Sequence, residues 1–303
     1  MVSSNLSGTD LQSYCSGLIE TGLLRVPKVD PPIKELDFRG SVQEHIRLIN
    51  ASDAVIKELI KSPIIQNIAV PTLLHPDLHK RNIYVSDEDP TLITALTDWQ
   101  SSGVDPIFAY AYETPDLIES PLDIPASLTE LKTSGGENDD PERKKLETDA
   151  SICRQTFEIT TRGWVPKLHE ARAADDTLLR IIRYCSSSWI DGAAALREEL
   201  IELSQRWTEL GLPGSCPYVP SQVELDIHKK QFEDYEAYLK LKLFLVHATD
   251  SNSDGWVAPE AWDTAREAHK AAFEEWMQTV KKGGDPDMTE EKARMLWPFD
   301  VNY

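Results

Sequence analysis

The sequence has few basic residues for its size. Among its 303 residues, 31 are Lys or Arg and 51 are Asp or Glu, which gives a formal net charge of −20. Nucleic acids and anionic membranes both require a positive face on the protein that binds them. The charge balance therefore argues against a protein that wraps a polyanion, and we expect no nucleic-acid partner.

Long apolar runs and a disulfide pattern are also lacking. No stretch approaches the roughly 18–20 apolar residues that a membrane-spanning helix needs, so we expect no transmembrane segment. The four cysteines are widely spaced and form no Cys-x-x-Cys pair, as is typical of reduced thiols inside the cell. Residues 1–30 lack the features of a signal or mitochondrial targeting peptide, so the default expectation is a cytoplasmic protein.

Hydrophobic residues nonetheless make up 41% of the chain, enough for a buried core, and their spacing is mostly helical. Ser41 and Glu44 have the spacing of a capping box, and apolar residues then recur at helical spacing until Pro63. Later helices are predicted over residues 196–210, 221–246 and 259–280. Residues 1–40 are predicted to be loop-rich, and the acidic, glycine-bearing segment SGGENDDPE at 134–142 is predicted to be an exposed, mobile linker.

The β-structure signal is confined to one region. Strands are predicted at residues 72–74, 83–85 and 92–96, with a turn of suitable chemistry, SDEDP, at 86–90. Beyond about residue 105 the pattern indicates helices and loops. The sequence therefore predicts an α+β fold that is predominantly helical and contains a small β-hairpin.

Polar side chains gather on either side of this hairpin. The segment HPDLHKRN occupies residues 75–82, and Asp98 follows the second hairpin strand. Phosphoryl transfer needs a carboxylate beside the attacking hydroxyl and oxygen ligands for Mg²⁺. In this interpretation Asp77 is the base, and Asn82 and Asp98 hold the metal.

A second interpretation is a metal hydrolase. His75, Asp77 and His79 alternate, so they would share one face of a strand and could bind Zn²⁺ or a related metal. Pro76 and the absence of a second close histidine cluster weaken this hypothesis. A third interpretation is a chance cluster of polar residues in a structural loop.

The two motifs together resemble a known family. HPDLHKRNIYV followed by LITALTDWQ is similar to the catalytic and metal-binding segments of the aminoglycoside phosphotransferase-like family, which has a protein-kinase-like fold. Further segments, DGWV at 254–257 and WPFD at 297–300, resemble the fungal branch that includes the altered-inheritance-of-mitochondria proteins. The resemblance covers most of the chain from about residue 41 onward.

The resemblance implies an ATP-dependent phosphotransferase, a kinase, that acts on a small hydroxylated or amino substrate. Asp77 matches the catalytic aspartate and His75 the histidine that braces its loop, while Asn82 and Asp98 match the ligands of Mg²⁺ and hence of ATP. His79 occupies a common motif position without an assigned role, and Pro76 stands where the bacterial enzymes have glycine. The branch adds the mitochondrion as a second candidate compartment.

The chain also departs from the family. Such kinases have an amino-terminal lobe with a β-sheet, a phosphate-covering loop and a lysine, whereas the residues ahead of Asp77 are predicted to form loops and helices. We therefore expect only the carboxy-terminal lobe: a loop-rich segment at 1–40, the catalytic core at 41–130, an acidic flexible linker at 131–150 and a helical extension at 151–303. Without that lobe we expect this chain alone to lack a complete ATP site. The missing lobe also favours an alternative function, a non-catalytic, pseudokinase-like protein that binds an unknown protein partner.

Overall fold

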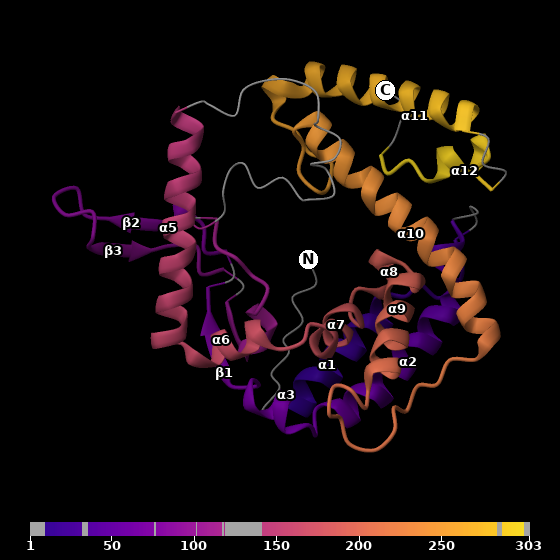
Figure 1. Ribbon diagram of the computed structural model, residues 1–303, viewed down its shortest axis with the longest axis horizontal. Helices are drawn as coiled ribbons and strands as arrows, with labels where there is room; N and C mark the ends of the chain where they lie inside the picture. Colours follow the sequence, from indigo (N-terminus) through magenta and orange to yellow (C-terminus); the bar gives the residue numbers. More distant parts are fainter. Residues whose placement is uncertain are drawn as a thin grey trace. The chain divides into compact units, whose positions relative to one another are not determined.

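The protein is described by a computed structural model whose elements are shown in Figure 1. The described residues are 10–31, 36–75, 77–100, 102–116, 118, 141–283 and 287–299. They belong to two compact units, each discontinuous in sequence. Unit 1 comprises residues 1–17, 56–183 and 208–214, and unit 2 comprises residues 18–55, 184–207 and 215–303.

Unit 1 carries all the β-strands among the described residues. Two separate antiparallel pairs form, β1 with β4 and β2 with β3. The strands are β1 (Pro71–Leu74), β2 (Ile83–Val85), β3 (Ile93–Leu96) and β4 (Gly103–Pro106). The main helices are α3 (Pro63–Asn67), α5 (Pro141–Trp164), α6 (Pro166–Ala173) and α7 (Thr177–Tyr184), with the 3₁₀ turns η2 (Lys80–Asn82) and η3 (Ile107–Tyr110).

The predicted hairpin is confirmed, and the sequence analysis missed one strand, which belongs to the other pair. In β2 and β3, Ile83 lies opposite Leu96, with an irregularity in the pairing near Val85. The missed strand is β4, whose four residues pair with β1 although residues near 105 are predicted to be helix or loop. Its sequence, Gly-Val-Asp-Pro, lacks strand propensity, so only the pairing with β1 reveals it.

The described part of unit 2 consists of helices and loops, without a β-strand. Its helices are α8 (Ser188–Asp191), α9 (Ala193–Arg206), α10 (Gln222–Thr249), α11 (Trp262–Gly283) and α12 (Glu290–Met295), with the turns η1 (Asp37–Arg39) and η5 (Pro259–Ala261). The unit also contains most of α2 (Val42–Leu59) and the second part of α1 (Leu11–Arg25). The two longest helices of the unit, α10 and α11, pack against each other.

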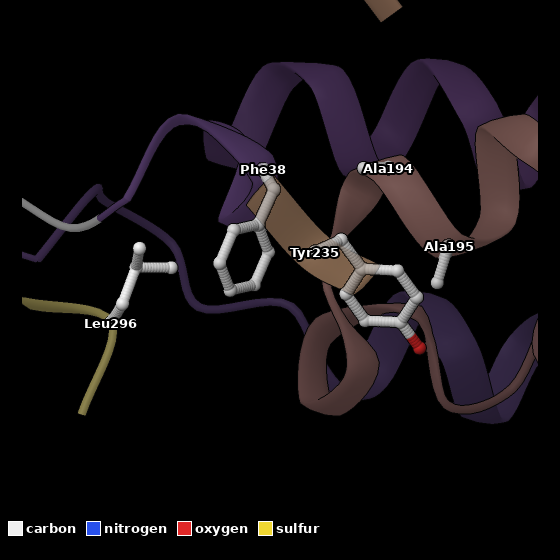
Figure 2. Packing of buried hydrophobic residues seen from close by; sticks show 5 residues of the cluster. All are labelled: Phe38, Ala194, Ala195, Tyr235 and Leu296. Atoms are coloured by element: carbon white, nitrogen blue, oxygen red, sulfur yellow. The ribbon is translucent and has the colours of Figure 1, made fainter. Parts of the chain in front are cut away.

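One core of unit 2 forms around Phe38, which is fully buried (Figure 2). Its ring lies 5.6 Å from the ring of Tyr235, and small alanines of α9 leave room for both aromatic side chains. Leu296, just after α12, joins the same cluster. This packing joins η1, α9, α10 and the end of the chain into one apolar core.

Two segments predicted as irregular are helical. Residues 11–25 form α1 within the segment predicted to be loop-rich. Gly22, a helix-weakening residue, is needed there because a Cβ atom would lie 2.3 Å from the backbone oxygen of Cys185. Residues 141–150 open α5, with Pro141 at a position that suits proline, whereas the predicted linker extends to residue 150. Residues 131–140 of that linker, which include most of the SGGENDDPE segment, lie outside the described part of the chain.

The predicted boundaries also differ from the units. Residues 151–303, predicted to be one helical extension, divide mainly at residue 183 between unit 1 and unit 2. None of the described helices combines the length and the apolar character needed to cross a bilayer. The four cysteines are thiols, as their spacing predicts.

A buried histidine in unit 2 makes the stability of the protein depend on pH. The ring nitrogens of His45 lie 2.7 Å from Ser188 Oγ and 2.7 Å from the backbone oxygen of Arg39. Burial lowers the pKa of His45 below its ordinary value of 6.5. Below about pH 6.5 the unfolded chain therefore binds a proton that the folded chain does not, and stability falls as the pH drops towards the folded pKa.

We expect the midpoint of urea unfolding to be lower at pH 5.5 than at pH 7.5, and we expect His45→Gln to reduce the difference. His247→Gln, a change at an exposed position of α10, is the matched control and should keep the wild-type difference. An equal pH dependence in all three proteins would contradict this role of His45.

Candidate functional site

The two polar segments found in the sequence lie between the two strand pairs of unit 1. β1 ends immediately before His75, and its partner β4 begins at Gly103, opposite Leu74. At the other end, the first segment leads into β2 and the second follows β3, and these two strands are joined by the pairing of Ile83 with Leu96. The backbone N–H of Thr97 also donates to the oxygen of Asn82 over 3.0 Å. The antiparallel pairing thus brings the backbone of Asn82 next to the residue that precedes Asp98.

His75 connects the two segments. Its Nε2 lies 2.7 Å from the backbone oxygen of Thr97, and its Nδ1 accepts the backbone N–H of Asp77 over 3.2 Å. Because Nδ1 accepts, the proton resides on Nε2 and is donated to Thr97. The ring of Trp99 meets the imidazole edge-on, with 4.7 Å between the ring centroids. His75 therefore positions the Asp77 backbone relative to the strand end that carries Asp98.

Asp77 is held by three neighbouring side chains. Its Oδ1 lies 2.6 Å from His79 Nε2, and its Oδ2 lies 2.8 Å from Arg81 and 3.2 Å from Asn82 Nδ2. Partial burial raises the pKa of Asp77, but the hydrogen bond and charge of Arg81, the charge of His79 and the Asn82 hydrogen bond outweigh it. The pKa therefore lies below its ordinary value, and the group is a carboxylate at neutral pH. A carboxylate in this position can orient a hydroxyl and accept its proton.

Asn82 is oriented by Asp77. Only 6% of the residue is exposed, and its Nδ2 donates to the backbone oxygen of Asp77 over 2.8 Å as well as to the carboxylate. With the amide nitrogen directed at these acceptors, the amide oxygen faces away from them. An amide oxygen is a ligand that suits Mg²⁺.

Asp98 has an unusual backbone conformation. Its φ is +64°, in the left-handed region that non-glycine residues seldom adopt, and its side chain is exposed. Aspartate tolerates this region better than most residues, and such conformations are concentrated at functional sites. The donors at the predicted metal position are thus one amide oxygen and one carboxylate, both suited to Mg²⁺, which keeps several waters.

The hydrolase hypothesis is not supported by the geometry. Both ring nitrogens of His75 face backbone groups, and Asp77 is hydrogen-bonded to His79 rather than aligned with it towards open space. In the described part of the chain, no group of three or more His, Cys, Asp or Glu side chains could hold a metal ion. Asn82 and Asp98 do not form such a group either, because they are only two residues and one of them is an amide.

A cleft of about 420 Å³ opens beside Asp77. His75 and His79 also line it, together with Tyr110 of η3 and with Phe157 and Trp164 of α5. Asn82 and Asp98 are not among its lining residues. The candidate base therefore faces a cavity that the candidate metal ligands do not share.

Sequence reasoning missed the residues that complete this site. Asp116 accepts the backbone N–H of Lys80 over 2.8 Å and lies 3.6 Å from His79 Nδ1, so it fixes the far side of the loop. It lies in a segment without regular structure, and no local motif marks it. Phe157 and Trp164 are seven residues apart and therefore share a helix face, a signal that is visible in the sequence but equally typical of core packing.

Comparison with known proteins adds no family to these observations. No protein-family model, no curated protein and no solved structure matches the chain.

Proposed function

We propose that the chain supplies the catalytic and Mg²⁺-binding half of a Mg²⁺- and ATP-dependent phosphotransferase, a kinase that acts on a small molecule. The observation that carries the proposal is the connection of Asp77, Asn82 and the Asp98 strand end by direct hydrogen bonds. Asn82 donates to both the carboxylate and the backbone of Asp77, and its own backbone pairs with Thr97. A loop with a purely structural role would not need an ionised carboxylate beside a cleft.

Each residue has a distinct role in this proposal. Asp77 orients the acceptor hydroxyl and takes its proton as the bond to phosphorus forms. His75 holds the Asp77 backbone in register with the end of β3. Asn82 and Asp98 would hold Mg²⁺, which when bound neutralises charge on the nucleotide phosphates. His79 and Arg81 keep Asp77 deprotonated and fix its rotamer.

A second candidate function is a non-catalytic interaction protein. Its support is the hairpin of β2 and β3, which exposes apolar side chains: Tyr84, Val85, Leu92 and Ile93 are each between 46% and 59% exposed. Monomeric proteins seldom leave such groups together in water. This candidate predicts no Mg²⁺-dependent binding of ATP, so one measurement separates the two functions.

The test is calorimetric titration of the full chain with ATP, in the presence of Mg²⁺ and again with EDTA. We expect Mg²⁺-dependent binding by the wild type, weaker than in a kinase that has both lobes. Asp98→Asn removes the charge of one proposed ligand and should weaken binding by about 10–100-fold.

Asp87→Asn makes the same chemical change at the exposed turn of the same hairpin and should bind as the wild type does. Equal binding by wild type and Asp98→Asn at saturating Mg²⁺ would refute the metal role. If the wild type does not bind ATP in the presence of Mg²⁺, the result favours the non-catalytic alternative.

A further inference from the structure

The cleft beside Asp77 has predominantly apolar walls. Its volume of about 420 Å³ falls in the range of small-molecule sites, roughly 300–1,000 Å³. Leu74 and Leu78 line the side that carries Asp77, and Phe157, Trp164 and Leu168 line the side formed by α5 and α6. Binding of an apolar ligand to such walls is favourable, because it removes apolar surface of both from water.

The aromatic wall is braced from behind. The guanidinium of Arg172 lies 5.4 Å from the centroid of the Phe157 ring and is itself held by a 3.0 Å hydrogen bond to the backbone oxygen of Ala111. Trp164, at the end of α5, is 86% exposed although it lines the cleft. A fixed ring beside an exposed indole suits a flat partner, because aromatic faces stack on one another.

The charges in the cleft restrict the ligand further. Among the described residues that line it, the acidic ones are Asp77 and Glu113, and there is no lysine or arginine. A phosphorylated or carboxylated acceptor would therefore meet the carboxylates of Asp77 and Glu113, and the lining side chain that could offset them, His79, is already paired with Asp77. An ammonium group would lose hydration on entering the cleft. Of the two carboxylates there, Asp77 is already paired with Arg81, and Glu113 is exposed to solvent.

We propose that this cleft binds a neutral alcohol with an aromatic or alicyclic ring, the ring between Leu78 and the Phe157–Trp164 wall and the hydroxyl at Asp77. The inference rests on the proposed function, because it names the class of phosphoryl acceptor. In the transfer, the acceptor oxygen forms a bond to the γ-phosphorus of ATP while the bond from that phosphorus to the bridging oxygen breaks, so ADP leaves. The hydroxyl proton passes to Asp77. The products are ADP and the phosphate ester of the alcohol.

The test uses three matched probes with the full chain and without nucleotide: 2-(2-naphthyl)ethanol, 2-(2-naphthyl)ethylamine and 2-naphthylacetate. The three probes share the naphthyl ring, and at pH 7 their side chains end respectively in a hydroxyl, an ammonium and a carboxylate. Binding is measured by saturation-transfer NMR and by calorimetry. We expect the alcohol to bind more tightly than the other two, and we expect Trp164→Ala to weaken its binding by about fivefold.

Trp256→Ala is the matched control, because this indole is also exposed, at 64%, but belongs to unit 2. It should bind the alcohol as the wild type does. Tighter binding of the amine or the carboxylate, or unchanged binding by Trp164→Ala, would overturn the inference.

The outcome is separable from that of the proposed function. Alcohol binding by a chain that fails to bind Mg²⁺-ATP would refute the kinase proposal and leave the ligand class in place. If the chain binds Mg²⁺-ATP and phosphorylates the amine or a sugar but not the alcohol, the ligand class is refuted and the kinase proposal stays in place.

Discussion

Replacing Arg197 with alanine is expected to destabilise unit 2 by about 1–3 kcal/mol, because it leaves the partly buried carboxylate of Glu44 without its cation. Only 2% of Arg197 is exposed. Its guanidinium forms an ion pair with Glu44, lies 2.6 Å from Gln231 Oε1 and lies 4.0 Å from Glu224. The Glu44 side chain is only 25% exposed, so its charge would stay partly out of water, whereas Glu224 would keep its 2.7 Å ion pair with Arg47.

The measurement is urea unfolding followed by near-ultraviolet circular dichroism, which reports on the aromatic cores. Lys61→Ala is the control: it removes an ion pair with Glu58 in which both side chains are at least 41% exposed, and should cost less than about 1 kcal/mol. Arg197→Met together with Glu44→Gln should recover part of the loss, because it removes charge from both sides. A loss below about 1 kcal/mol for Arg197→Ala would contradict the account.

Asp77→Asn should lower the rate of phosphoryl transfer by about 10²–10⁴-fold and leave ATP binding unchanged. The amide has nearly the same shape and can still accept from Arg81, but it cannot take the hydroxyl proton. Transfer of the labelled γ-phosphate of ATP to 2-(2-naphthyl)ethanol measures the rate, and the calorimetric titration measures binding.

Asp87→Asn again serves as the control and should turn over as the wild type does. Full activity of Asp77→Asn would refute the assigned mechanism. The absence of transfer to any hydroxyl by a wild-type chain that binds Mg²⁺-ATP would refute the phosphotransferase proposal itself.

Local sequence signals predicted much of the fold because they act over a few residues. Ser41 and Ser221 accept the backbone N–H groups of Glu44 and Glu224, as the capping-box spacing predicts. The partner of the two glutamate side chains could not be predicted. Both converge on Arg197, more than 150 residues from Glu44 and 27 from Glu224, a meeting that only the tertiary packing creates.

In the candidate site too, the features set by local sequence could be predicted and those set by tertiary packing could not. The hairpin turn and its flanking strands predicted that Asn82 would lie beside the end of β3, because antiparallel pairing follows from a short connection, and the Thr97–Asn82 backbone hydrogen bond confirms that much. The Asp77–Arg81 contact and the role of His75 depend on loop geometry that no spacing rule gives. The cleft wall comes from α5, about 80 residues further along the chain, so its ligand class could not be read from the motif.

The most direct test of a metal site at Asn82 and Asp98 is to map where a divalent cation binds. Mn²⁺ can replace Mg²⁺ and broadens the amide NMR signals of residues close to it. With ATP present, substoichiometric Mn²⁺ should first broaden the amides of Asn82 and of residues 97–99, and should leave the acidic turn at 87–89 sharp. Strongest broadening at that turn or on the helices of unit 2, with Asn82 and Asp98 unaffected, would contradict the proposed site.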